Sequence, residues 1–144
     1  AHEERKQALA LAKFTTTLAQ VSVPRVNLIA GAAYGTAAEV MNSKAIGADF
    51  VLAWPQASVG MMDAEQAVRI MYAEEIDADD DKVALIAEKT AEYAEGQSSA
   101  LAAAKRGYVD DIIEPDATRK RLIAAYEMLY GKKVTPVIKK HTAV

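Results

Sequence analysis

The sequence contains no cysteine among its 144 residues. This absence excludes a disulfide framework, a thiolate zinc site and a cysteine nucleophile. It also fits the cytoplasm, where we expect the chain to reside. Histidine is nearly absent too, because the two histidines, His2 and His141, lie at the ends of the chain. A Ser-His-Asp triad needs a histidine held beside a serine, so we expect neither to act as its base.

An excess of positive charge and long apolar runs are missing as well. Seventeen basic and twenty acidic residues give a formal net charge of −3, which favours neither nucleic acid nor an anionic membrane as a partner. No apolar run approaches the roughly 20 residues that span a bilayer, and the first residues do not resemble a signal peptide. They open directly into a helical pattern, so we expect the chain to begin within a longer protein.

Motifs for metal and nucleotide sites are equally lacking. The chain has no HExxH pair, no GxGxxG turn and no phosphate-binding glycine loop. The acidic run at 77–81 lacks the glycine and the closing glutamate of a calcium loop. We therefore predict no metal site and a solvated acidic loop.

What is present predicts one globular domain, since 51% of the residues are hydrophobic. Short apolar runs alternate with helical patterns, which is typical of an α/β domain. The expected strands are 26–30, 49–53, 57–61 and 109–113. The expected helices are 3–20, 37–46, 63–72, 82–93 and 98–105, and a last helix from Pro115 with an apolar face of Leu122, Ile123, Tyr126, Leu129 and Tyr130. Four strands are few for a layered sheet, which again indicates a missing upstream half.

Several boundaries depend on single residues. Asp63 and Gln66 predict a capping box at the start of the third helix. Gly47 predicts the end of the second helix, and Gly96 and Gly107 predict breaks on either side of 98–105. We divide the chain into a domain at 1–130 and a basic, extended tail at 131–144.

The stretch best suited to chemistry is the strand-to-helix turn at 33–38, Ala-Tyr-Gly-Thr-Ala-Ala. The first N–H groups of a helix have no partner within the helix and lie at its positive end. Gly35 would make the sharp turn, and the N–H groups of Thr36 and Ala37 would form an oxyanion hole. Small residues serve close helix–sheet packing equally well, so this alternative stays open.

Glu39 follows this turn. It could act as a general acid or base if burial raised its pKa. Alternatively, its charge would only stabilise the positive end of the helix.

Several motifs accompany the turn in a fixed order. They are Met41-Asn42-Ser43-Lys44, Gly47-Ala48-Asp49, Ala53-Trp54-Pro55, the segment 61–68 (MMDAEQAV), the segment 106–115 (RGYVDDIIEP) and Thr118-Arg119. This order resembles the C-terminal domain of the biotin-dependent acyl-CoA carboxyltransferases. That family includes the carboxyltransferase subunits of propionyl-CoA carboxylase, acetyl-CoA carboxylase and methylmalonyl-CoA decarboxylase. The resemblance covers about residues 1–130.

The resemblance implies the C-terminal portion of a crotonase-like (ClpP-like) ββα superhelix. It implies carboxyl transfer between carboxybiotin and an acyl-CoA thioester. The implied partners are the acyl-CoA substrate, a biotin carboxyl carrier protein, the upstream carboxyltransferase half and further copies in a homo-oligomer. We expect no nucleic acid partner and no membrane span.

The resemblance also implies roles for particular residues. The family's turn Tyr-Gly-Gly-Ala reads Tyr34-Gly35-Thr36-Ala37 here. The amides of Thr36 and Ala37 would stabilise negative charge on the ureido oxygen of biotin. Tyr34, Gly35 and Ala38 would contact biotin. A positive φ at Thr36 would strain its β-branched side chain.

Three further residues would shape the acyl pocket: Glu39, Met61 and Met62. For Met61 and Met62, packing in the core is the competing prediction.

Two other functions compete with carboxyl transfer. Gly35-Thr36-Ala37-Ala38-Glu39 also resembles the turn of crotonase-type hydratases and isomerases, although these enzymes usually pair two acids and no second one is evident. Alternatively, the isolated chain is a non-catalytic oligomerisation module, because a missing half would leave an apolar face exposed.

Overall fold

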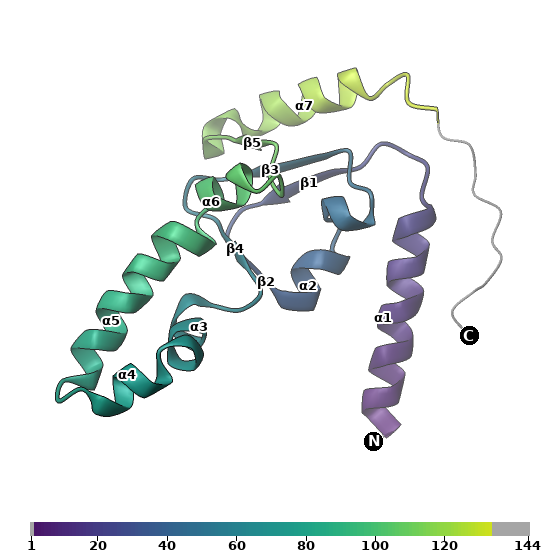
Figure 1. The fold of residues 1–144 in the computed structure, drawn as a ribbon. Coiled ribbons are helices and arrows are strands. Elements are labelled where there is room, and N and C mark those ends of the chain that lie inside the picture. The colour runs from purple at the N-terminus through teal and green to yellow at the C-terminus, as the bar shows by residue number, and fades with distance from the viewer. Residues whose placement is uncertain (1, 134–144) are drawn as a thin grey trace.

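The computed structural model describes residues 2–133, and Figure 1 shows its helices and strands in order. The longer helices are α1 (His2–Gln20), α3 (Ala64–Met71), α5 (Lys82–Tyr93) and α7 (Thr118–Met128). Shorter helical segments are α2 (Gly35–Val40), η1 (Lys44–Ile46), α4 (Ala73–Ala78), η2 (Ala94–Ser98), α6 (Ala100–Lys105) and η3 (Pro115–Ala117). The strands are β1 (Val26–Ile29), β2 (Ala32–Tyr34), β3 (Phe50–Ala53), β4 (Ser58–Gly60) and β5 (Asp111–Ile112).

The strands form two small parallel sheets. The larger has the order β1-β3-β5, with Val26 opposite Phe50 and Leu52 opposite Asp111. The smaller pairs β2 with β4, so that Tyr34 lies opposite Gly60. Helices join these parallel strands, as their geometry requires. The predicted α/β class is confirmed.

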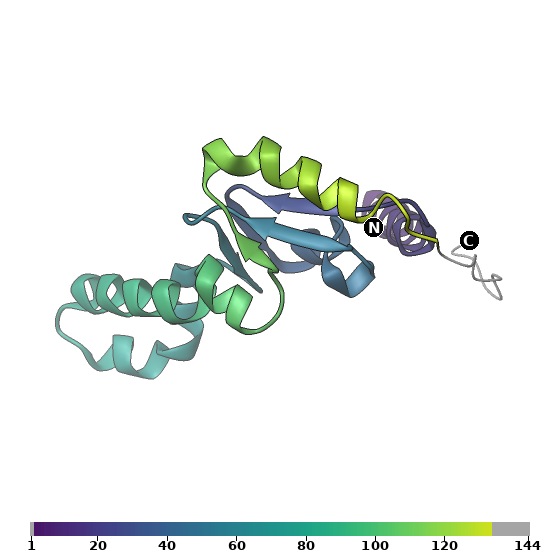
Figure 2. The same cartoon turned by 90° about the horizontal axis from the view of Figure 1, so that it is seen from above.

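The core lies where β3 meets α6. Its side chains are mostly small, which allows helix and sheet to approach closely, and all are buried: Val51, Ala53, Ala57, Ala100, Ala103 and Val109. Figures 1 and 2 show α7 along the larger sheet, α1 standing apart at one end and α3–α5 projecting at the other. No helix in the described range 2–133 is long and apolar enough to cross a membrane.

The apolar face predicted for the last helix is largely exposed on this chain. Ala125 is the buried residue of α7, whereas the side chains of Ile123, Tyr126 and Tyr130 are 49%, 47% and 93% exposed. Together with Trp54 they line an open groove of about 770 Å³. An apolar surface therefore remains on this chain, as expected if further protein covers it.

The predicted second helix is too long. Helix α2 ends at Val40, and Asn42 adopts a left-handed φ of 61°. Ser43 Oγ then donates to the carbonyl of Glu39 at 2.6 Å, a local side-chain bond that competes with continued helix. The chain resumes as the short segment η1, and Gly47, at φ 92°, closes that segment as predicted.

Other differences concern short elements. Strand β2 and helix α4 were not predicted, and α4 includes part of the expected acidic loop. The predicted break between two helices occurs, but not at Gly96: α5 continues through it as the π-helical turn η2, and the extended residue Ser99 then separates η2 from α6. Asp63 caps α3 as predicted, but it accepts from the amide of Glu65 at 2.9 Å and not from that of Gln66.

Arg25 connects α1 with η1 and with the loop before β3 through hydrogen bonds. The residue is 8% exposed, and its guanidinium donates to the carbonyls of Leu18 at 2.6 Å and Ile46 at 2.9 Å. Its backbone N–H donates to Asp49 Oδ2 at 2.7 Å, and Lys132 Nζ reaches the same oxygen at 2.8 Å. Lys132, which we assigned to the tail, therefore contacts the domain. Residues 134–144 of that tail lie outside the described residues.

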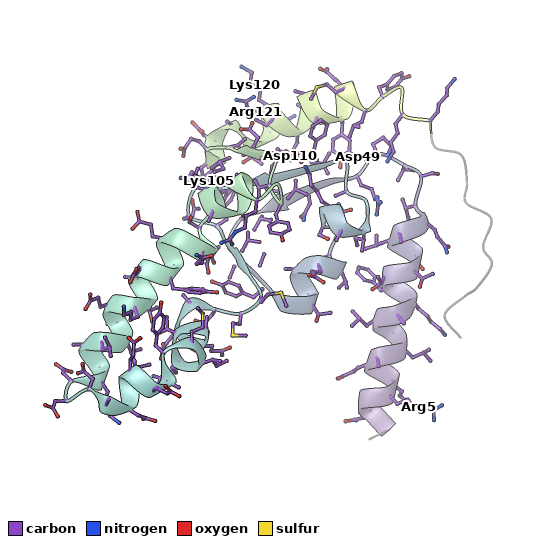
Figure 3. All side chains as sticks on the ribbon, viewed as in Figure 1. Arg5, Asp49, Lys105, Asp110, Lys120 and Arg121 are labelled. Atoms are coloured by element: carbon purple, nitrogen blue, oxygen red, sulfur yellow. The ribbon has the colours of Figure 1, made fainter. Side chains whose placement is uncertain are left out.

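Burial alone would raise the pKa of Asp49. The hydrogen bond from Lys132, the hydrogen bond from the backbone of Arg25 and the two positive charges outweigh this effect and lower the pKa below its ordinary value. Figure 3 marks Asp49 on the loop that leads into β3. The folded protein thus stabilises the ionised carboxylate.

Candidate active site

The predicted turn exists and joins β2 directly to α2. Gly35 begins the helix with φ 59°, which glycine adopts at no steric cost. A Cβ at Gly35 would lie 3.2 Å from the carbonyl oxygen of Met61. Because Tyr34 pairs with Gly60, the end of β4 packs against the turn. Glycine is therefore required here both by φ and by close approach.

The first amides of α2 are left without a capping group. The N-cap residue Tyr34 makes no side-chain hydrogen bond to the helix, and the first turn contains no acidic residue. Within residues 2–133, no side chain accepts from the amides of Thr36 or Ala37. Free N–H groups at a helix start attract a negatively charged oxygen. The strain expected at Thr36 does not occur, because its φ is not positive.

The turn opens into a cleft of about 910 Å³. Residues from β1, β2, α2, β4, η2 and the loop after α6 line this cleft. It collects six of the predicted site residues: Tyr34, Gly35, Ala37, Ala38, Glu39 and Met61. Thr36 and Met62 do not line it. However, the Thr36 N–H is part of the peptide group that links Gly35 to Thr36, and Gly35 does line the cleft.

Two of these residues differ from their expected environments. Glu39 is exposed, so the burial on which its expected role as a general acid or base depended is absent. Met61 is 74% exposed, so packing in the core is wrong for this side chain, while Met62 is half-buried. Glu39 is also the single carboxylate among the described residues of the cleft. A hydratase that works with two acids is therefore not favoured.

The prediction missed polar groups that contact residues of the cleft, and Lys44, which lines it. Tyr34 Oη donates to Ser58 Oγ at 2.8 Å and so fixes the tyrosine ring beside the turn. Lys44 forms an ion pair with Asp110, whose other oxygen accepts from the amide of Val51 at 2.8 Å. Figure 3 shows Asp110 on the loop that leads into β5.

A second missed group is the pair of Arg106 and Gln97. The Arg106 guanidinium donates twice to Gln97, and both residues line the cleft. Lys44, Asp110 and Arg106 all lie in motifs that carried the resemblance. That pattern could have singled them out, but it assigned them no contact. No cluster of metal-binding side chains occurs in the part of the chain that the structure describes.

Comparison with known proteins identifies relatives along almost the whole chain. The propionyl-CoA carboxylase carboxyltransferase subunit of Haloferax mediterranei is 43% identical over 130 residues, which are 90% of this chain and 25% of that protein. Methylmalonyl-CoA decarboxylase subunit alpha of Propionigenium modestum is 41% identical over 130 residues, again 90% and 25%. The chain thus spans about a quarter of the length of these relatives.

Solved structures of related proteins have the same fold as this chain. A crystal structure of transcarboxylase 12S, a hexamer with methylmalonyl-CoA and methylmalonic acid bound, superposes with a TM-score of 0.89 at 37% identity, over 96% of this chain and 27% of that one. The crotonase-like fold predicted from the motifs is confirmed. A family model described as the carboxyl transferase domain matches residues 8–144. The resemblance predicted from the motifs is therefore confirmed, and the chain belongs to the carboxyl transferase domain family.

Proposed function

We propose that this chain supplies the biotin side of an active site that transfers a carboxyl group between carboxybiotin and an acyl-CoA thioester. The observation that carries the proposal is the uncapped Gly35–Thr36–Ala37 turn at the wall of the cleft. Relatives named as carboxylase and decarboxylase subunits support this type of reaction.

The proposed role of the turn is electrostatic. Bound carboxybiotin would supply the carboxyl group, and loss of that group to the acyl-CoA would leave negative charge on the ureido oxygen. The backbone N–H groups of Thr36 and Ala37 would donate to that oxygen. Each donor of an oxyanion hole contributes roughly a factor of 100 to 1,000 to the rate. The exposed, non-polar Ala37 side chain leaves the approach open.

The remaining residues would hold the reactants. Tyr34, fixed by Ser58, would contact the biotin ring together with Gly35 and Ala38. Glu39 and Met61 would border the acyl group, since both line the cleft. Met62 was also expected to border the acyl group, but it lies outside the lining of the cleft, so we propose no contact for it.

The complete enzyme would need more than this chain. We propose that the upstream carboxyltransferase half binds the acyl-CoA, and that a biotin carboxyl carrier protein delivers carboxybiotin. The exposed apolar face of α7 fits a subunit that is covered by further protein in a homo-oligomer. We place this assembly in the cytoplasm, which the absence of cysteine fits.

The test uses the complete subunit that contains this chain, purified as an oligomer. It measures transfer of labelled carboxyl from malonyl-CoA or methylmalonyl-CoA to free biotin. We expect transfer that depends on added biotin and is insensitive to avidin pretreatment of the enzyme. A folded, oligomeric subunit without biotin-dependent transfer would contradict the proposal.

A further inference from the structure

A π-helical turn forms part of the wall of the cleft. Helix α5 continues past Tyr93 into η2 (Ala94–Ser98) before α6 begins. Such turns are rare and frequently occur at functional sites. Tyr93, Gln97 and Ser98 all line the cleft. The irregular turn therefore presents polar side chains to the cavity.

Arg106 holds this turn in place from the end of α6. Its Nη1 donates to the carbonyl oxygen of Gln97 at 2.9 Å, and its Nη2 donates to the Gln97 side-chain oxygen. A guanidinium has five N–H donors, so several remain for another acceptor. Gln97 thus positions the arginine without using up its donors.

The charge of Arg106 is not neutralised by a contacting carboxylate. Both its acceptors on Gln97 are neutral, and no ion pair involves Arg106 within residues 2–133. Among the described residues that line the cleft, the other cation is Lys44, which is paired with Asp110. Arg106 is therefore the cation available to an anionic group of a bound molecule.

A continuous series of contacts connects Arg106 with the proposed oxyanion turn. Gln97 precedes the buried Ser98, whose Oγ would lie 3.6 Å from a Cβ at Gly60. Gly60 pairs with Tyr34, the residue before Gly35. Figure 1 shows the same arrangement, with the junction of α5 and α6 beside β4 and β2. The arginine and the turn thus border one cleft on a shared framework.

We propose that Arg106, positioned by Gln97, binds the carboxylate of the carboxyl donor. This inference rests on the proposed function and adds the residue that recognises the transferred group. The planar fork of a guanidinium matches a carboxylate in a bidentate pair. That carboxylate belongs either to carboxybiotin or to a carboxylated acyl-CoA such as methylmalonyl-CoA, which share this chemistry.

Equilibrium binding tests the inference without relying on catalysis. The complete subunit is titrated calorimetrically with methylmalonyl-CoA and with propionyl-CoA, which lacks the carboxylate. If the bound carboxylate is that of the acyl-CoA, Arg106→Gln should weaken methylmalonyl-CoA binding at least about tenfold, as expected when a charged hydrogen bond is lost. If it is that of carboxybiotin, the loss should appear with carboxybiotin instead. Propionyl-CoA binding should change less than about twofold, because its contacts do not include the carboxylate. Arg106→Lys should recover part of the loss, since it keeps the charge but not the fork.

Steady-state kinetics separate the two sources of the carboxylate. Arg106→Gln should raise KM for the carboxylated donor and leave KM for free biotin unchanged. An effect with methylmalonyl-CoA alone assigns the CoA carboxylate, and an effect with carboxybiotin alone assigns the biotin carboxylate. Gln97→Ala keeps Arg106 but removes the hydrogen bond from Arg106 to the Gln97 side chain. It should raise KM for the same carboxylated donor as Arg106→Gln does, by a smaller factor.

The matched control is Arg69→Gln. Arg69 pairs with Glu65 on the exposed face of α3, outside the cleft, so this variant should behave as wild type. Equal losses for carboxylated and uncarboxylated ligands, or no change for any donor, would overturn the inference. The two proposals can also fail separately. If the wild-type subunit transfers no carboxyl group but its preference for carboxylated ligands still depends on Arg106, the proposed function is contradicted and the role of Arg106 is not.

Discussion

The indole Nε1 of Trp54 donates a hydrogen bond of 2.9 Å to Thr118 Oγ1, although 64 positions separate the two residues. Trp54 follows the central strand β3, and Thr118 begins α7. The bond therefore links the last helix to the end of the buried strand. Both residues lie in motifs that carried the family resemblance. This hydrogen bond is therefore one structural role of those motifs.

Replacing Thr118 by valine should destabilise the chain by about 1–3 kcal/mol, because a half-buried indole N–H would lose its acceptor. Thr118→Ser keeps the hydroxyl and should stay close to wild type. Urea unfolding followed by the fluorescence of Trp54, the one tryptophan of the chain, measures both. A valine variant as stable as the serine variant would show that this bond contributes nothing.

Gly35→Ala should also destabilise the chain, by about 1–2 kcal/mol, because a side chain is strained at positive φ. The added methyl would also meet the carbonyl of Met61 at 3.2 Å. Gly31→Ala is the matched control, since a Cβ there would meet nothing within 4 Å. Chemical denaturation of both variants provides the comparison, and equal stability would argue against strain at the turn.

Asp49 should make the stability depend on acid. Its pKa is lowered in the folded state, so its contribution is fully present above the unfolded pKa of about 3.9 and is lost as pH falls through the folded value. Asp49→Asn should therefore lower the free energy of unfolding at neutral pH by about 1–3 kcal/mol through lost charged hydrogen bonds.

The measurement is the difference in unfolding free energy between wild type and Asp49→Asn, followed from about pH 6 to about pH 2.5. This difference should shrink towards zero in acid. Asp80→Asn serves as the control, because Asp80 is exposed and no hydrogen bond to it occurs among the described residues. A difference that stays constant across this range would contradict the assigned interactions of Asp49.

Sequence patterns predicted those elements that local periodicity determines. Helix α5 was expected at its observed bounds, 82–93, because its apolar residues recur at helical spacing. The turn at Gly35 was expected from one glycine among small residues, and its positive φ agrees. The cleft beside it follows from how distant segments pack, which no local pattern contains.

The missed features depend on contacts between distant residues. Strand β2 has only three residues and exists because it pairs with β4. The early end of α2 is accompanied by pairing of Lys44 with Asp110, 66 positions away. The π-helical turn at Gly96 resembles an ordinary helix break in sequence, and the Arg106 bonds to Gln97 that hold it arise from the fold.

The backbone amides of the turn are the centre of the proposed mechanism, and Thr36 allows them to be tested. Thr36→Pro removes one N–H in the first turn of a helix, where proline is tolerated. Thr36→Ala keeps that N–H and removes only the exposed side chain. The decisive measurement is kcat for carboxyl transfer to biotin by the complete subunit carrying either substitution, with unfolding curves to show that both variants fold. We predict that the proline variant loses roughly 100- to 1,000-fold while the alanine variant retains wild-type activity. A folded proline variant that transfers carboxyl as fast as the alanine variant would contradict the role of this turn.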